Sequence, residues 1–375
     1  MPWKEMNIMQ TRAEFIHLAR QKGSNIRQLC KRYGITPRTA YKWIKRYEME
    51  GISGLEDRSK RPKKTIHRVS VTTEAKVLEI RKETGWGGRK IARVLIEQGC
   101  EQVPHPNTIT DILRRNGQLV SCENEKHHSI QRFEYASSNE LWQMDFKGHF
   151  QTLTGRCHPL TVLDDHSRFC LGLRACENET GQTVKAQLVD IFRQYGLPKA
   201  FLCDNGTPWG TGYPVLELSA LTTWLIRLGI HPLHGRPAHP QTQGKDERFH
   251  RTLKTELLQG RSFTDLADCQ HYFDRWRDRY NLIRPHEALH LDAPVQHYQI
   301  SQRTFPEVLP PVEYNEGEIV RKVLDRGVIS YKGQTFRIGK GLIGQFVALR
   351  PSSVEDLFDV FFCSFKIRQI CLALP

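Results

Sequence analysis

Three acidic residues, each set in its own short segment, limit what this chain can fold into and do. Asp145 lies within the strand-like segment Trp142–Phe146, and Asp204 follows a short apolar run and precedes a turn. Glu247 lies early in a helical pattern. Carboxylates brought together from separate elements form an oxygen site for a hard divalent cation. Two such cations about 3.5–4 Å apart can activate an attacking oxygen and stabilise a leaving oxygen at phosphorus. The pattern therefore predicts metal-dependent phosphodiester chemistry.

The segments around these acids resemble the DDE integrase core of bacterial insertion-sequence transposases and retroviral integrases. The resemblance rests on ordered blocks: Trp142–Phe146, Cys203–Gly206, Pro240–Lys254, Tyr280-Asn281 and Arg284–Leu289. It implies that residues 130–300 form a ribonuclease-H-like core, in which a mixed sheet is flanked by helices. It also implies that Asp145, Asp204 and Glu247 are both the catalytic residues and the metal ligands, holding two Mg²⁺ or Mn²⁺ ions. The expected activity is DNA strand cleavage and strand transfer by a homo-oligomer bound to double-stranded element ends and target DNA.

Helical geometry supports the third acid. At about 100° per residue, Glu247 falls on one face with Arg251 and Lys254, whereas an apolar stripe of Phe249, Leu253 and Leu257 falls on another. The resemblance matches Gln243, Arg251 and Lys254 to positions that face DNA. A structural ion pair from Glu247 to Arg251 is the alternative.

Other acidic residues compete for the same role. Asp246 points about 100° away from Glu247 around the helix, and the motif alignment favours Glu247 as the third ligand. Asp164 and Asp165 lie in a hairpin-turn context and are interpreted as structural. His234 and His239 flank the Pro240–Gln243 loop, but Mg²⁺ prefers oxygen ligands, so we expect them to contact DNA or to pack.

The basic charge of the chain is concentrated near its N-terminus. The formal net charge is +14, and residues 1–70 hold 17 Lys and Arg against 6 Asp and Glu. This asymmetry is typical of a protein that binds the phosphate backbone of nucleic acid. A solvated basic surface is the alternative.

Residues 1–50 are expected to form a helix-turn-helix domain with a first helix over Thr11–Lys22, a second that is capped by Ser24 and runs to about Tyr33, and a third from Pro37 onward. Thr36 and Pro37 supply a hydroxyl cap and a proline at the first helical position. In a recognition helix the N-terminal side chains reach base edges and later ones reach phosphate. Candidate base contacts are therefore Arg38, Thr39 and Lys42, and candidate phosphate contacts are Lys45 and Arg46. The alternative is a purely structural helical bundle.

Residues 51–72 are interpreted as a basic linker, and residues 73–120 as a second helix-turn-helix domain with helices over 74–84, 87–98 and 106–116. Similar transposases grip a terminal inverted repeat with two such modules. The DNA contacts expected in these two regions are Arg58, Lys60, Arg61, Lys63, Lys64, Arg114 and Arg115. A solvated tether and a structural bundle are the respective alternatives.

The remaining sequence predicts the order of the core and a third kind of domain. Strands are expected over 141–150, 160–164 and 169–174, then a helix over 183–195, a strand over 199–203, a helix over 216–228, a strand over 230–233 and the catalytic helix over 244–259. Short strands joined by tight turns at Asp325–Gly327 and Lys332-Gly333 predict a small β-barrel over residues 316–375. The fold class is therefore multidomain α/β.

Several classes of protein are disfavoured by what the sequence lacks. It has no apolar run approaching the roughly 18 residues of a membrane span, no signal-peptide core and no GxxxxGK[ST] segment for a nucleotide cofactor. Its ten cysteines form no CxxC pair or zinc-like spacing, and the zinc module of retroviral integrases has no counterpart before Asp145. We therefore expect a bacterial, nucleoid-associated cytoplasmic protein without a membrane partner.

One departure from the family pattern and two rival functions stay open at this point. A segment over residues 207–215, rich in Gly, Pro and aromatic residues, lengthens the spacing between Asp204 and Glu247. The rivals are a DNA-binding repressor with an inactive core and a nuclease of the same fold acting on RNA–DNA hybrids. The terminal repeat, the target preference, the transposition route and the number of subunits are not encoded in any motif.

Overall fold

The chain is described from a computed structural model that covers residues 7–58, 69–119, 134–204, 206–210, 218–234 and 244–372. These residues belong to two compact units, Met1–Arg68 and Val69–Pro375. Within the described ranges, no helix is both long and apolar enough to cross a membrane.

The first unit is built from α1 (Ile8–Ala19), α2 (Ile26–Arg32) and α3 (Pro37–Glu50). The predicted cap of α3 is confirmed, since Thr36 Oγ1 accepts a hydrogen bond from the Thr39 N–H at 3.3 Å. The cap of α2 is Asn25, not the expected Ser24. Ser24 instead donates its hydroxyl to the carbonyl of Ala19 at 2.7 Å, which closes the preceding turn.

This unit continues beyond residue 50. A 3₁₀ helix, η1 (Gly51–Leu55), follows α3 directly, and Leu55 is fully buried among Phe15, Ile16 and Trp43. Arg12 donates to the carbonyl of Leu55 at 2.7 Å and pairs with Asp57 at 2.9 Å. The expected linker therefore starts later than residue 51, because its first residues complete the core of the domain.

The second unit begins with three helices, α4 (Val71–Thr84), α5 (Gly88–Glu97) and α6 (Pro106–Arg115). They share an apolar core that includes Val77, Ile91, Leu95, Ile109 and Leu113. Gly88 permits the close approach of α5 and α6, because a Cβ there would lie 2.3 Å from the carbonyl oxygen of Pro106. This bundle matches the predicted second helical domain to within a few residues.

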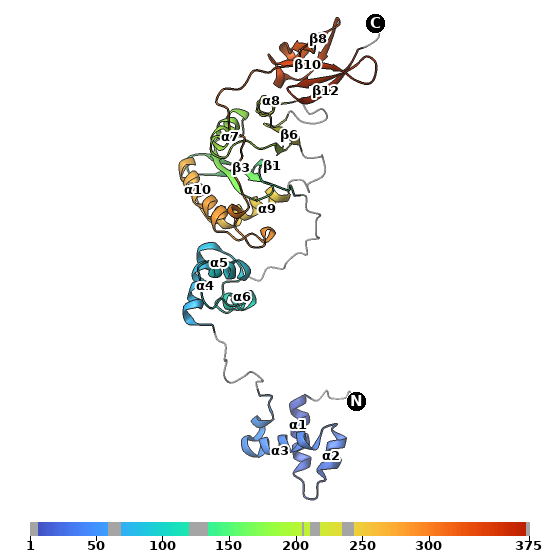
Figure 1. Cartoon of the computed structure of the whole chain (residues 1–375). Coiled ribbons are helices and arrows are strands. Elements are labelled where there is room, and N and C mark those ends of the chain that lie inside the picture. The colour runs from blue at the N-terminus through green and yellow to red at the C-terminus, as the bar shows by residue number, and fades with distance from the viewer. Residues whose placement is uncertain are drawn as a thin grey trace. The chain divides into compact units, whose positions relative to one another are not determined.

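A mixed sheet forms the centre of the second unit (Figure 1). Its strands are β1 (Leu141–Phe146), β2 (Phe150–Gln151), β3 (Arg156–Asp164), β4 (Cys170–Cys176), β5 (Ala200–Cys203) and β6 (His231–His234). β1 lies between β3, which is antiparallel to it, and β5, which is parallel to it. β4 extends the antiparallel side and β6 the parallel side. The predicted strand and helix order of the α/β core is confirmed.

Helices surround this sheet (Figure 1): α7 (Gly181–Tyr195), α8 (Ala220–Arg227), α9 (Gly244–Leu253), continued by the π-helical turn η3 (Lys254–Leu258), and α10 (Leu266–Leu282). α7 and α8 share one apolar cluster with β1, and α9 and α10 share another with β3 and β4. The sequence argument did not predict α10, although its buried residues Cys269, Phe273, Trp276 and Tyr280 follow helical spacing. Short 3₁₀ turns η4 (Glu287–Leu289) and η5 (Pro294–Gln296) follow it.

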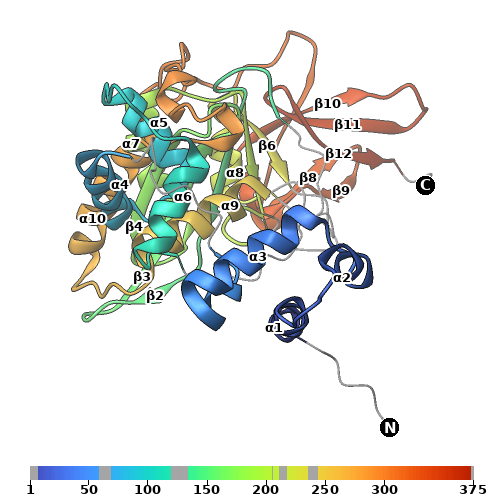
Figure 2. The same ribbon diagram turned by 90° about the horizontal axis from the view of Figure 1, so that it is seen from below.

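The C-terminal strands form open sheets. β7 (Ile319–Lys322), β10 (Phe346–Pro351), β11 (Leu357–Phe362) and β12 (Phe365–Cys371) form an antiparallel sheet in the order β12-β11-β10-β7. β8 (Val328–Tyr331) and β9 (Gln334–Arg337) form a separate hairpin, drawn beside β12 in Figure 2. The predicted strands are present, but the expected small β-barrel is not confirmed, because no pairing of β12 with β7 closes the sheet in the described range.

Candidate active site and DNA-binding residues

Asp145 lies near the carboxyl end of β1, the central strand, opposite Thr161 of β3. Its Oδ1 accepts a hydrogen bond from the Phe146 N–H at 2.8 Å. Burial, followed by the charges of Asp204 and Glu179, raises the pKa of Asp145 from 3.8 to about 6 against the lowering effect of the Phe146 hydrogen bond. Lys147 and the Phe146 hydrogen bond lower this pKa but do not offset the effect of burial.

Asp204 directly follows β5 and is exposed. β1 and β5 run parallel, with Gln143 paired to Leu202, and extending this register brings Asp145 level with Asp204. The two acids therefore lie at the same edge of the sheet on neighbouring strands, which explains why the charge of Asp204 raises the pKa of Asp145. The Asp204 carbonyl also contacts His234 Nδ1 at 3.1 Å, and burial lowers the pKa of that ring. His234 is thus placed by a backbone contact, and His239 lies outside the described residues.

The helix α9 has an exposed face and a buried face, as its sequence predicts. Glu247, Arg251 and Lys254 are exposed, and Phe249, Leu253 and Leu257 are buried. Glu247 and Arg251 are both described and do not form the ion pair that the structural alternative requires. Gln243 lies outside the described residues.

Asp246 behaves differently from its neighbour Glu247. It is 2% exposed, and burial, followed by the charges of Asp145 and Asp165, raises its pKa well above its usual range. Its Oδ1 has no hydrogen-bond partner among the described residues. The buried side of α9 thus turns Asp246 toward Asp145, while the exposed side carries Glu247.

A histidine that the sequence argument did not single out joins α9 to Asp145. His250 Nε2 lies 2.9 Å from Thr161 Oγ1, which donates to the carbonyl of Asp145 at 2.9 Å. Because the hydroxyl proton is used in this way, His250 must donate from Nε2, and its Nδ1 lies 4.0 Å from Asp145 Oδ2. Burial, followed by Lys147, lowers the pKa of His250 to about 4, so the ring is neutral near pH 7. In the sequence, the indication that His250 lies near the site is its position three residues after Glu247, about one helical turn along α9.

The start of α9 is fixed by a buried ion pair. Lys245 Nζ lies 2.6 Å from Asp165 Oδ1, and Asp165 is 1% exposed. Asp165 also accepts hydrogen bonds from the Gln143 side chain at 2.6 Å and from the Tyr135 N–H at 3.0 Å. Asp164 accepts from the N–H of Asn139 at 2.7 Å and from the Ser167 backbone and hydroxyl. Both acids thus have the structural contacts expected of them.

The donor chemistry of this region fits a hard divalent cation. The charge of Asp204 raises the pKa of its neighbour Asp145. The buried Asp246 has an Oδ1 without a hydrogen-bond partner among the described residues. A bound cation would stabilise the charged form of these carboxylates. No three His, Cys, Asp or Glu side chains are grouped closely enough to hold a metal in the parts of the chain that the structure describes. The segment that precedes α9 lies outside those parts.

The first unit separates the five residues expected on its recognition helix. Arg38, Lys42 and Lys45 are exposed on α3. The Thr39 hydroxyl contacts Thr36 Oγ1 at 3.0 Å. The Trp43 ring has two cations near it, since its centroid lies 5.0 Å from the Arg46 guanidinium and 5.1 Å from Lys42 Nζ. Tyr41, which the sequence argument did not name, is 60% exposed and lies three residues from Arg38 on the same helix.

The other basic residues expected to contact DNA divide into two sets. Arg58 pairs with Glu50, Arg114 with Asp111, and Arg115 with Glu74, so each has a carboxylate partner within its own domain. The remaining ones lie outside the described residues, and these are Lys60, Arg61, Lys63 and Lys64.

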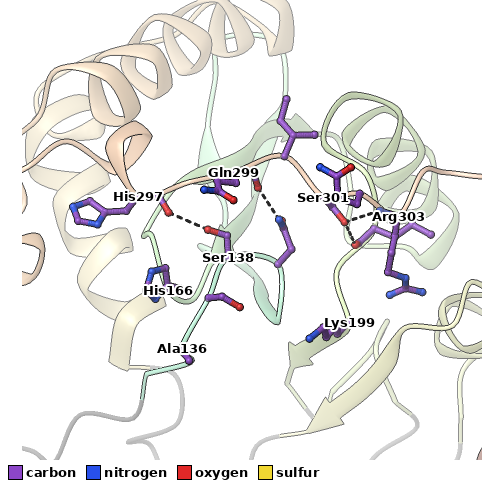
Figure 3. A pocket seen from close by; sticks show the side chains of 13 residues that line it. Ala136, Ser138, His166, Lys199, His297, Gln299, Ser301 and Arg303 are labelled. Carbon is purple, nitrogen blue, oxygen red and sulfur yellow. Dashed lines mark hydrogen bonds between the residues drawn. The ribbon is translucent and has the colours of Figure 1, made fainter.

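A hollow of about 410 Å³ lies at the other end of β1 and β5 (Figure 3). The segment 297–303 crosses this region and is held by hydrogen bonds to its backbone carbonyls and from the Ser301 side chain. Ser138 donates to the carbonyl of His297 at 3.0 Å, Asn139 to that of Gln299 at 2.7 Å, and Ser301 to that of Leu197 at 2.7 Å. None of the predicted site residues lines this hollow.

Comparison with known families assigns the parts of the chain. Two models described as integrase core domain match residues 136–240 and 228–294, which contain Asp145, Asp204 and Glu247. A model described as the C-terminal domain of IS481 family transposases matches residues 318–374. The chain carries an integrase core domain. Helix-turn-helix and homeodomain-like models match residues 11–63 and 39–113, so DNA-binding domains precede the integrase core.

Individual relatives agree with these matches. The chain is 29% identical over 158 residues to an uncharacterised 39.2 kDa protein of insertion element IS476 from Xanthomonas euvesicatoria, a match that covers 42% of this chain and 44% of that protein. It is 27% identical to an uncharacterised 31.7 kDa protein of insertion element IS407 from Burkholderia multivorans, covering 59% of this chain and 78% of that protein. It is 24% identical to the transposase for transposon Tn552 from Staphylococcus aureus, covering 91% and 79%. The chain thus spans less than half of the Xanthomonas relative.

Two solved structures show weaker likeness. One is a simian T-cell lymphotropic virus intasome in complex with the PP2A regulatory subunit B56 gamma, with 15% identity, a TM-score of 0.40 and coverage of 80% of this chain and 99% of that one. The other is the HTLV-2 integrase catalytic core domain in complex with magnesium, with 13% identity, a TM-score of 0.32 and coverage of 43% and 97%.

Proposed function

We propose that the chain is a DNA transposase that binds the terminal inverted repeats of a mobile element, cuts DNA strands at its ends and joins them to target DNA. The observation that carries the proposal is that Asp145 near the end of β1 and Asp204 directly after the parallel neighbour β5 lie at one edge of the sheet, close enough for Asp204 to raise the pKa of Asp145. Glu247, on the exposed face of α9, completes the proposed triad.

Asp145, Asp204 and Glu247 are the residues that would hold two Mg²⁺ or Mn²⁺ ions, which supply activation of the attacking oxygen and stabilisation of the leaving one. In the first step the oxygen of water attacks the scissile phosphorus, and the departing strand keeps a 3′-hydroxyl. In the second step the oxygen of that hydroxyl attacks a phosphorus of the target, so one phosphodiester replaces another and no nucleotide cofactor is needed. Thr161 and the neutral His250 hold the Asp145 backbone against α9 throughout.

The same proposal assigns roles to the other domains. Arg38 and Lys42 at the start of α3 are the proposed base contacts, and Lys45 on the same face is a proposed phosphate contact. Arg251 and Lys254 beside Glu247 would meet DNA phosphates at the cut site. Because two element ends must be joined, the acting form is a homo-oligomer on DNA, working in the bacterial cytoplasm at the nucleoid. For the C-terminal domain to be a small barrel, β12 would have to pair with β7 and close the open sheet.

A repressor with an inactive core is the rival that the first unit alone would support. It predicts specific binding to the element end with no cut product. A nuclease specific for RNA–DNA hybrids predicts cutting that is independent of the end sequence.

The proposal is tested by substituting the acids in the full-length protein. Asp145→Asn, Asp204→Asn and Glu247→Gln are each expected to lower cleavage of a labelled element end by about a hundred- to a thousandfold, the scale of losing an electrostatic group at a reacting centre, while binding to the end is kept. Glu177→Gln, an exposed carboxylate after β4, is the matched control and should cut normally. Equal cleavage by Glu247→Gln and the control would exclude the triad, and Asp246→Asn would then be the variant to compare.

A further inference from the structure

Glu256 is a buried carboxylate in η3, the turn that directly continues the helix of Glu247. It accepts hydrogen bonds from Arg284 Nε at 2.9 Å, Trp86 Nε1 at 3.2 Å and Trp276 Nε1 at 3.3 Å. The side chains of Glu256 and Arg284 are 11% and 9% exposed. Because hydrogen bonds to a charged acceptor are stronger than neutral ones, three such donors fix the position of this carboxylate.

The donors come from two parts of the second unit. Trp276 and Arg284 belong to the integrase core, whereas Trp86 lies between α4 and α5 and is 3% exposed. Further contacts surround the Trp86 hydrogen bond. Arg93 of α5 pairs with Asp292 at 2.8 Å, and Arg279 of α10 donates to the carbonyl of Glu83 at 3.3 Å. The α4–α6 helices are thus fastened to one continuous surface of the core.

That surface contains two of the motifs on which the family resemblance rests, and the proposed chemistry gives neither of them a role. Tyr280-Asn281 and Arg284–Leu289 both lie within the segment Arg279–Asp292. Lys90 of α5 is half-buried near this segment; its partial burial, followed by the charge of Arg284, lowers its pKa to about 8. The ring of Tyr280 packs against His286 at 4.8 Å, so the segment is itself held in one shape.

The same contacts reach the helix of the proposed catalytic acid. Phe249, two residues after Glu247, packs its ring 5.4 Å from Trp276 and 5.0 Å from Tyr280. A displacement of Glu256 would therefore also displace α9, because Glu256 and Phe249 lie on one helical segment and both contact the ring of Trp276.

We propose that Arg279–Asp292 is a docking platform for the α4–α6 helices and that Glu256 is the positioning residue at its centre. The inference rests on the proposed function and deepens it. Glu256 anchors α4–α6 and lies in the turn that continues the helix of Glu247. DNA bound by α4–α6 therefore lies at a fixed distance along its length from the proposed catalytic acids. The platform thereby sets which phosphodiester is cut.

The first test uses full-length protein without DNA and compares Trp86→Phe with Trp276→Phe. Each variant replaces a buried indole and removes one hydrogen bond to Glu256, but only Trp86 lies on the docked helices. Hydrogen exchange of the α5 amides should be about tenfold faster in Trp86→Phe and within about twofold of wild type in Trp276→Phe. Equal exchange of α5 in the two variants would overturn the docking platform.

The second test maps the cut phosphodiester on an end-labelled duplex that carries the element end. Trp86→Phe and Glu256→Gln should spread cleavage over neighbouring phosphodiesters while binding the end within about threefold of wild type. Trp276→Phe keeps an aromatic ring against Phe249 and leaves the Trp86 hydrogen bond to Glu256 in place, so it should cut at the wild-type position. A single, unchanged cut position in Trp86→Phe would overturn the positioning role. If the wild-type protein cuts no DNA, the proposed function fails, and hydrogen exchange still decides the docking platform.

Discussion

At the scale of single residues, the environment of each side chain separates catalytic candidates from structural ones. Asp145 has a pKa raised by burial and then by Asp204, which is typical of acids that await a cation, whereas Asp165 lies in a saturated network with Lys245. The sequence predicted roles for both acids from their motifs, but it could not show these environments, because the Lys245 contact joins residues eighty positions apart. It also missed His250, whose role depends on Thr161 of another strand.

Arg38 provides a prediction at the same scale. It is exposed at the start of α3, whereas Arg58 is already paired with Glu50. Arg38→Ala should weaken binding to the element end by about ten- to a hundredfold, the loss expected of one good base contact, and leave metal-dependent cleavage of a saturated end unchanged. Arg58→Ala is the control and should bind within about threefold of wild type. Fluorescence anisotropy with the labelled end measures both, and equal losses would remove Arg38 from the base contacts.

At the scale of elements, the sequence predicted most helices and strands because their apolar periodicity and caps are local signals. It failed where an element depends on distant partners. The 3₁₀ turn η1 contains no periodic pattern, yet Leu55 is fully buried by α1 and α3. Likewise, the closing of β7 to β12 into a barrel depends on sheet curvature, which alternation along single strands does not encode.

The burial of Leu55 yields a stability prediction for the first unit. Leu55→Ala should destabilise it by about 2–5 kcal/mol, since the side chain is removed from a packed core. Ile52→Ala, three residues earlier and 65% exposed, should change stability by less than about 0.5 kcal/mol. Hydrogen exchange of the α1–α3 amides in the full chain measures both values. Equal effects would show that η1 does not belong to the domain core.

At the scale of the whole molecule, a buried histidine makes the second unit sensitive to acid. Burial, followed by Arg284 and Lys90, lowers the pKa of His286 from 6.5 to about 2. Between these pH values the unfolded chain binds a proton that the folded chain does not, so the stability from this group is complete above pH 6.5 and is lost as the pH falls. Relative to His286→Gln, the wild type should lose roughly 2 kcal/mol of stability between pH 6.5 and pH 5.

Urea unfolding of wild type, His286→Gln and His271→Gln at the two pH values tests this expectation. His271 is exposed on α10, so its variant should keep the wild-type pH dependence. A wild type whose pH dependence matched that of His286→Gln would contradict the assignment of acid sensitivity to the docking platform.

The central claim, that the integrase core joins DNA ends to target DNA, is tested most directly by strand transfer. Purified full-length protein would be mixed with Mg²⁺, a labelled duplex ending in the element's own 3′-hydroxyl, and a plasmid target. We predict labelled plasmid with wild-type protein and none with Glu247→Gln, although both bind the duplex. Specific binding without joined product in either Mg²⁺ or Mn²⁺, or equal joining by Glu247→Gln, would contradict the account.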